Sequence, residues 1–128
     1  MKIYYAHHLW KYDTNIETWE QDLIAEHFPQ CEIVNPNGAV KQGRSEEDIM
    51  ADCLQMVRSC DGLVFSSLSG VIGQGVMQEI AEAHRHGLTV WYLHHGTIER
   101  PDTIYIEPLE NSTSRIYATV WAEGGGSQ

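Results

Sequence analysis

A carboxylate near the start of a helix is the side chain of this sequence best placed to do chemistry. Glu79 lies in the segment 73–83, which follows an apolar run at 62–65 and a loop of small residues at 66–72. A strand, a glycine-bearing loop and a helix in this order form ligand sites in open α/β sheets. Backbone N–H groups at the helix start favour an anion, and Glu79 would supply a base or a nucleophile. The alternative interpretation is that Glu79, in the first helical turn, only complements the helix dipole.

Polar side chains also follow the other apolar runs that we expect to be strands. His7 and His8 follow the first run, Asn35 the second, Ser66 and Ser67 the third, and His94 and His95 the fourth. The carboxyl ends of parallel strands meet at one edge of a sheet, where ligands bind. The sequence therefore predicts a pocket whose wall combines Tyr5, His7 or His8, Asn35, Ser66, Gly75 and Glu79.

The four strand-end histidines do not predict a metal site. Imidazole suits zinc, but neighbouring side chains of a strand point to opposite faces of the sheet. At most one histidine of each pair would face the cleft, and two ligands make a poor zinc site. A histidine that contacts a base or a phosphate is the interpretation we prefer for His7 or His8.

The remaining aromatic and basic residues carry weaker signals. Trp19, Trp91 and Trp121 are expected in the core, whereas Trp10, in the loop after the first strand, is placed to cover a nucleobase. Three cations are surface charges by default, on loops that approach the cleft: Lys11, Lys41 and Arg44.

Strand and helix patterns alternate along the chain. Apolar runs predict strands at 2–6, 32–34, 62–65, 88–93 and 103–106, and helical spacing with capping residues predicts helices at about 16–28, 46–60 and 74–86. Residues 115–121 fit either a strand or a helix. This alternation predicts a single-domain three-layer α/β/α fold with a parallel five-stranded, flavodoxin/Rossmann-like sheet of order 2-1-3-4-5.

Size and composition limit the function. The 128 residues predict one domain over 1–121, with a flexible tail at 122–128. Eighteen carboxylates against eight Lys and Arg give a net charge of −10, which argues against a nucleic-acid polymer as partner. Neither a signal peptide nor a membrane-spanning run is expected. Three cysteines without CxxC spacing are typical of thiols in a reducing compartment, so we expect a cytoplasmic protein.

Several segments together resemble the nucleoside 2-deoxyribosyltransferase superfamily, which includes the 2′-deoxynucleoside 5′-monophosphate N-glycosidases. They are residues 4–6, the loop after the third strand and residues 75–83. The family's sequence pattern has a glycine four residues before a nucleophilic glutamate. The glutamate is followed by an apolar residue, then a small residue, and an alanine two residues further on. The positions that fit this pattern are Gly75, Glu79, Ile80, Ala81 and Ala83. The resemblance extends loosely over residues 1–93.

The resemblance implies hydrolysis or transfer at the N-glycosidic bond of a (deoxy)nucleoside or its 5′-monophosphate, with Glu79 as the nucleophile. It also implies a homodimer and a small-molecule nucleoside or nucleotide as partner, and no cofactor is expected. The expected substrate-binding residues are Tyr5, His7, His8, Asn35, Ser66, Ser67, Gly73, Gly75 and Gln78.

The sequence departs from the family pattern at two places. Ser66 and Ser67 stand where the family often has a carboxylate just after the third strand, and the bulkier His7-His8 replaces a small-residue turn. A non-catalytic nucleotide-binding or nucleotide-sensing module of the same fold is therefore the alternative function.

Overall fold

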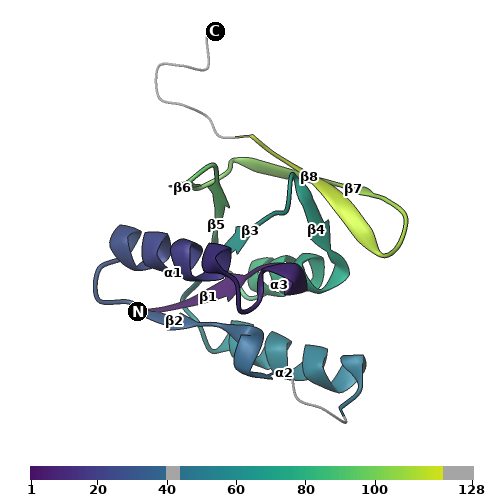
Figure 1. Cartoon of the computed structure of the whole chain (residues 1–128), viewed down its shortest axis with the longest axis horizontal. Helices are drawn as coiled ribbons and strands as arrows, with labels where there is room; N and C mark the ends of the chain where they lie inside the picture. Colours follow the sequence, from purple (N-terminus) through teal and green to yellow (C-terminus); the bar gives the residue numbers. More distant parts are fainter. Residues whose placement is uncertain (40–43, 120–128) are drawn as a thin grey trace, which may run out of the picture.

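Two β-sheets and three α-helices make up the computed structural model over the residues that it describes, 1–39 and 44–119 (Figure 1). The larger sheet has the order β2-β1-β3-β5-β6. Its strands are β1 Lys2–Ala6, β2 Glu32–Val34, β3 Gly62–Ser66, β5 Thr89–His94 and β6 Thr97–Glu99. The smaller, antiparallel sheet contains β4 Val71–Gly73, β8 Thr113–Thr119 and β7 Thr103–Pro108, in that order.

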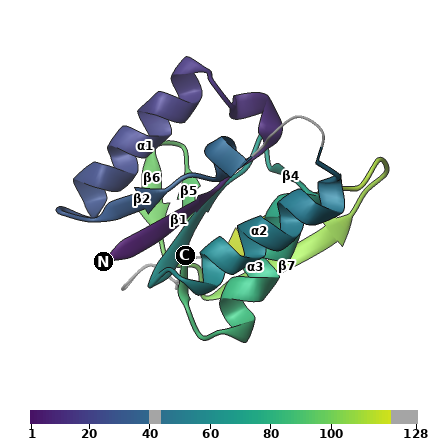
Figure 2. The same cartoon turned by 90° about the horizontal axis from the view of Figure 1, so that it is seen from below.

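The helices cover both faces of the larger sheet. Helix α1 (Asn15–His27) lies on one face, and α2 (Glu46–Arg58) and α3 (Gln74–Arg85) lie on the other, as Figure 2 shows. Two short 3-10 helices, η1 (Leu9–Lys11) and η2 (Pro36–Ala39), follow β1 and β2. The predicted three-layer α/β arrangement is therefore confirmed.

Local sequence explains where the helices begin and end. The Thr14 and Ser45 side chains accept hydrogen bonds from backbone N–H groups three residues later, at the starts of α1 and α2. Helix α3 ends before Gly87, which has φ +73°, a left-handed conformation that glycine adopts without strain.

The alternation of side chains along β1 divides the core into two layers. Tyr4 packs with Leu63, Val57 and Ile80 on the side of α2 and α3. Tyr5, the next residue, packs with Ile24 on the side of α1. Neighbouring residues of one strand thus reach opposite faces of the sheet, which decides where the polar residues described below lie.

The prediction of a purely parallel sheet of order 2-1-3-4-5 is wrong at its last strand. Strands β2, β1, β3 and β5 are parallel as predicted, but the edge strand is β6, which is antiparallel to β5. Only the nine residues 94–102 separate the predicted fourth and fifth strands, whereas a parallel crossover needs a dozen or more. Instead, His95 and Gly96 have φ 52° and 76° and form a two-residue turn, and the chain returns at once as β6.

The predicted fifth strand exists but lies in the other sheet, as β7. The undecided segment at 115–121 is a strand as far as Thr119. It belongs to β8, which pairs with β4, a strand that was not predicted. Ile106 and Ile116 face the α3 side of the core, whereas Tyr105 and Tyr117 on the opposite face are exposed. Lys41, Trp121 and the predicted tail at 122–128 lie outside the described residues.

Candidate functional site

Glu79 lies deeper along its helix than the sequence indicated. It is the sixth residue of α3, and the first turn of α3 contains no acidic residue. The side chain is 4% exposed. Because dipole effects fade beyond the first turn, while burying a carboxylate costs free energy, complementing the helix dipole does not explain a glutamate at this position.

A tyrosine of β1, an interior strand of the larger sheet, holds the Glu79 carboxylate. The Tyr4 hydroxyl donates a hydrogen bond to Glu79 Oε2. Burial raises the pKa of Glu79 to about 7, although the hydrogen bond from Tyr4 opposes this rise. Burial, and then the negative charge of Glu79, raise the pKa of Tyr4 far above its usual value, so the hydroxyl keeps its proton and remains a donor. Glu79 is therefore present in both its charged and neutral forms near neutral pH.

A second polar cluster lies on the α1 side of the sheet around Glu20, which is 5% exposed. Glu20 Oε1 accepts hydrogen bonds from the Tyr5 hydroxyl and from Ser66 Oγ, the latter at 2.8 Å. Lys11 Nζ donates to Glu20 Oε2 at 2.9 Å, to Ser66 Oγ at 2.9 Å and to the Ser67 carbonyl at 2.8 Å. All three protons of the ammonium group are used, so Lys11 has none left for a phosphate.

Glu17 organises the third cluster, one helical turn before Glu20. His7 Nε2 lies 2.7 Å from Glu17 Oε2, and the Asn35 amide donates to the same oxygen at 3.2 Å. Burial lowers the pKa of His7, while the contacts of its two ring nitrogens, Nε2 with Glu17 and Nδ1 with the Tyr5 carbonyl oxygen at 3.1 Å, oppose this shift. Burial pushes the pKa of Glu17 upward, but the hydrogen bonds from His7, the Asp13 N–H and Asn35 outweigh this and hold the pKa below its usual value.

Tyr12 lies between these clusters and Glu79. Its ring is 4.8 Å from that of His7. Burial raises the pKa of Tyr12, and the charges of Glu79 and Glu17 raise it further. The pKa of Tyr12, a residue of the loop after β1, therefore depends on the charges of both carboxylates.

The start of α3 lies beside the loop after β1. A Cβ atom at Gly73 would stand 3.5 Å from His8 Cδ2, in ordinary van der Waals contact, so the imidazole lies directly against this backbone position. His8 itself accepts a hydrogen bond from the Trp10 N–H at 3.1 Å and caps η1. Gly73 makes no side-chain cap to α3, so no side chain of the cap residue occupies the free N–H groups of its first turn.

Two other residues of α3 have more ordinary surroundings. A Cβ at Gly75 would lie 3.0 Å from Met50 Cε, so this glycine lets α2 and α3 pack closely. Gln78 is half-buried. Gly75 therefore lies at the contact between α3 and the flexible end of the Met50 side chain of α2.

The predicted site residues thus fall into two groups. Tyr5, His7, Asn35 and Ser66 lie in the clusters on the α1 side, and Glu79 lies with Tyr4 on the other side. The cause is the alternation of Tyr4 and Tyr5 along β1. The binding roles of these residues remain predictions.

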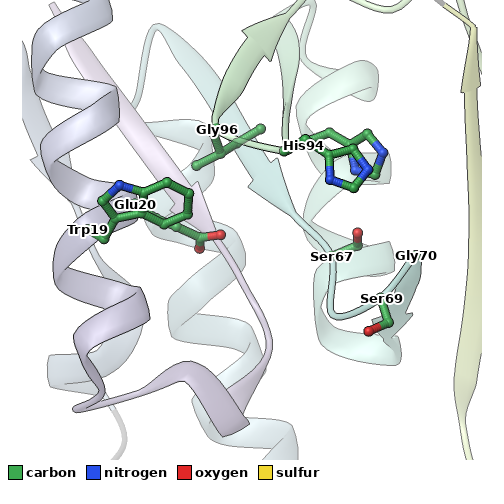
Figure 3. Close-up of a pocket in the computed structure, with 9 residues that line it drawn as sticks. Trp19, Glu20, Ser67, Ser69, Gly70, His94 and Gly96 are labelled. Atoms are coloured by element: carbon green, nitrogen blue, oxygen red, sulfur yellow. The ribbon is translucent and has the colours of Figure 1, made fainter.

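An open cavity of about 590 Å³ lies at the carboxyl edge of the sheet, on the α1 side (Figure 3). Polar and aromatic side chains in its wall are Trp19, Glu20, Ser67, Ser69, His94 and His95. Of the predicted substrate-binding residues, only Ser67 lines it, and Glu79 does not. Ser67 Oγ also lies 2.7 Å from the Tyr92 hydroxyl.

Two expectations from the sequence are wrong. Lys11, expected at the surface, is 4% exposed because it pairs with Glu20, and Trp19, expected in the core, is 51% exposed. Neither Glu17 nor Glu20 was predicted as a site residue. Their spacing with the buried Ile24 marks one face of α1, and this spacing is the signal that could have revealed them.

Within the described ranges, no group of three His, Cys, Asp or Glu side chains is close enough to hold a metal ion. None of the helices in those ranges combines the length and the apolar content needed to cross a membrane.

Comparison with known proteins gives one informative likeness. No family sequence model and no curated protein sequence matches the chain. A solved structure of a 2-desoxiribosyltransferase from Leishmania mexicana superposes with a TM-score of 0.55 at 16% sequence identity, over 92% of this chain and 80% of that chain. The chain has the fold of a 2-deoxyribosyltransferase. The likeness supports the resemblance noted in the sequence at the level of the fold, which by itself does not determine a reaction.

Proposed function

We propose that the protein binds a small nucleoside or nucleoside 5′-monophosphate and hydrolyses or transfers at its N-glycosidic bond, with Glu79 as the nucleophile. The observation that carries this proposal is the buried Glu79 carboxylate, held by the Tyr4 hydroxyl and with a pKa of about 7. A buried carboxylate with a perturbed pKa near the ligand-binding edge of a sheet marks a candidate reactive group. The deoxyribosyltransferase fold supports a sugar C1′ as the atom that it attacks.

In this mechanism a carboxylate oxygen of Glu79 forms a bond to C1′ as the bond from C1′ to the base nitrogen breaks. The electron pair of the broken bond leaves with the base, which takes up a proton. Water then releases the sugar in hydrolysis, or a second base does so in transfer. Tyr4 would orient the nucleophile, and loss of water around Glu79 would strengthen its interaction with the oxocarbenium-like transition state.

The start of α3 is the proposed position of the sugar or its 5′-phosphate. Its first-turn N–H groups lack a side-chain cap, and His8 lies against Gly73. Tyr5, His7, Asn35 and Ser66 act in this proposal by fixing the loop after β1, because their polar atoms are committed to Glu17 and Glu20. Ser67 and Gln78 remain proposed substrate contacts.

One observation favours a non-catalytic nucleotide-binding module as the second candidate. The end of β3 presents the hydroxyls of Ser66 and Ser67 instead of a carboxylate, and Ser66 is already bonded to Glu20 and Lys11. A module of this kind would bind a nucleoside or nucleotide and leave the N-glycosidic bond intact.

The test is incubation with a panel of ribo- and deoxynucleosides and their 5′-monophosphates, with and without a second free base, followed by chromatographic detection of released or exchanged base. Release without added base indicates hydrolysis, and exchange alone indicates transfer. Binding of a panel member by calorimetry without release or exchange would favour the second candidate.

A homodimer and a reducing compartment belong to the same proposal. Leu9, Trp10 and Ile16 are exposed by 60%, 77% and 48% and gather around η1 and the start of α1, which supports an interface there. Cys31, Cys53 and Cys60 are free thiols, as a cytoplasmic protein would have. Sedimentation analysis at several concentrations measures the oligomeric state.

A further inference from the structure

The open cavity on the α1 side has walls of unusual backbone conformation. Ser69 and Gly70, with φ 53° and 79°, form the turn between Leu68 and Val71, which make an isolated β-bridge. His95 and Gly96, with φ 52° and 76°, form the turn of the β5–β6 hairpin. Both turns line the cavity. A non-glycine residue in the left-handed region costs free energy, and such residues concentrate at ligand sites. Ser69 and His95 are two such residues, and both lie in the cavity wall opposite α1.

Trp19 supplies an aromatic surface at this cavity. Half of its side chain is exposed, and a Cβ atom at Gly96 would lie 3.6 Å from the indole ring, so the ring rests against the turn at the point where that turn has no side chain. Figure 3 shows Trp19 and Glu20 projecting from α1 on one side of the cavity, with His94 and Ser67 across from them. An exposed indole beside a cavity offers a stacking surface for a flat ring.

Glu20 supplies a hydrogen-bond acceptor in the same wall. Its Oε1 has two donors, Tyr5 and Ser66, and among the described residues its Oε2 has only Lys11. A carboxylate oxygen accepts about two hydrogen bonds, so Oε2 keeps one position for a donor from a ligand. The cation of Lys11 is consumed by three acceptors, and burial followed by the neighbouring His95 lowers the pKa of His94. Lys11 and His94 therefore provide no cation for an anionic ligand at this cavity.

We propose that this cavity is a second small-molecule site, which binds an uncharged planar nitrogen heterocycle by stacking on Trp19 and by an N–H donor to Glu20. The site is separate from Glu79, which lies on the opposite face of the sheet and does not line the cavity. The inference goes beyond the proposed function, since a heterocycle held here is not the base that leaves from Glu79.

Free adenine and cytosine, each a flat ring with N–H donors, are the probes, and caffeine, a purine with no N–H group, is the matched ligand control. Calorimetry on the full chain should show adenine or cytosine binding at least tenfold more tightly than caffeine. In a ¹H–¹⁵N spectrum the Trp19 indole and Gly96 amide signals should shift on titration. Equal affinity for caffeine, or no binding of either base at millimolar concentration, would overturn the proposal.

Three variants assign the site. Trp19→Ala should weaken binding on the order of tenfold, because it removes the aromatic surface on which the heterocycle stacks. Tyr105→Ala removes a ring that is 62% exposed outside the cavity and should leave the affinity unchanged. Glu79→Gln should also retain the affinity. Unchanged binding in Trp19→Ala, or lost binding in Glu79→Gln, contradicts a separate site, and both outcomes are independent of whether the protein releases base from a nucleoside.

Discussion

The Tyr4 hydroxyl donates a hydrogen bond to the Glu79 carboxylate, across 75 positions of sequence and between β1 and α3. Both side chains are buried. The pair gives the carboxylate a fixed direction in a region with little water, and the opposing effects of burial and hydrogen bonding bring its pKa to about 7. Four predictions follow from this pair and from the clusters on the other side of the sheet.

Replacing Glu79 with glutamine should abolish release of base from whichever nucleoside the protein cleaves. The amide keeps the shape of the side chain but removes the charge that attacks C1′, which usually costs about 4 kcal/mol or more in the barrier. Glu47→Gln, on the exposed face of α2, is the surface control. Glu82→Gln is a less neutral control, because Glu82 pairs with Arg58 at 2.6 Å and with His86 at 3.0 Å and is 3% exposed. Wild-type turnover in Glu79→Gln would remove the nucleophile from the mechanism.

Tyr4→Phe should shift the pH profile of kcat/KM to higher pH. The wild-type profile should rise through about pH 7 as Glu79 ionises, since kcat/KM reports the free enzyme. The hydrogen bond from Tyr4 lowers the pKa of Glu79, so its removal leaves burial unopposed and raises that pKa. Tyr117→Phe, which removes an exposed hydroxyl bonded to Glu107, should leave the profile unchanged. A Tyr4→Phe profile that coincides with the wild type would show that the hydroxyl does not tune Glu79.

The free energy of unfolding should depend on pH because of the raised pKa of Glu79. The folded state holds its pKa at about 7 and the unfolded state near 4.5, so the folded state favours the protonated carboxyl. This contribution is complete below pH 4.5 and is lost as the pH rises through 7, by about 3 kcal/mol in all. Urea unfolding of the wild type and Glu79→Gln from pH 5 to 8.5 should show the variant gaining stability relative to the wild type as the pH rises. A constant difference between the two proteins would mean that Glu79 is ionised throughout.

Removing the buried cation of the α1 side should destabilise the fold strongly. In Lys11→Met, Glu20 stays buried without its ion-pair partner, which costs about 3–5 kcal/mol of unfolding free energy. The double variant Lys11→Met with Glu20→Gln removes the uncompensated charge and should recover part of this loss. The measurement is the unfolding free energy of both variants and of Glu20→Gln alone. Simple additivity of the two substitutions would show that the pair is not coupled.

The layers of the fold were predictable because local patterns repeat along the chain. Apolar runs gave the four parallel strands, and the residues at Thr14 and Ser45 gave the two caps. The edge of the sheet was missed because the two-residue turn at His95-Gly96 does not contain the Asn-Gly or Asp-Gly signal usual for a hairpin. His95 adopts a positive φ there, a conformation that is uncommon for residues other than glycine.

The site was less predictable because its geometry depends on long-range pairing. The helical spacing of Ile16, Trp19, Leu23, Ile24 and Phe28 placed Ile24 correctly in the core. Ile16 and Trp19 are exposed, however, and the inner face contains Glu17 and Glu20 instead. The burial of two carboxylates is explained only by His7 and Lys11, which arrive from the loop after β1. No periodicity in α1 alone contains that information.

The interior position of β1, between β2 and β3, also has a consequence for how the protein folds. Ile3 must pair with Ile33 on one side and with Gly62 on the other, so the middle of the sheet closes only after long stretches of chain have met. In the β5–β6 hairpin His94 pairs with Thr97, only three residues later. This hairpin should therefore form in microseconds. Loop closure between distant partners slows folding, so the docking of the first strand into the sheet should set the overall folding rate.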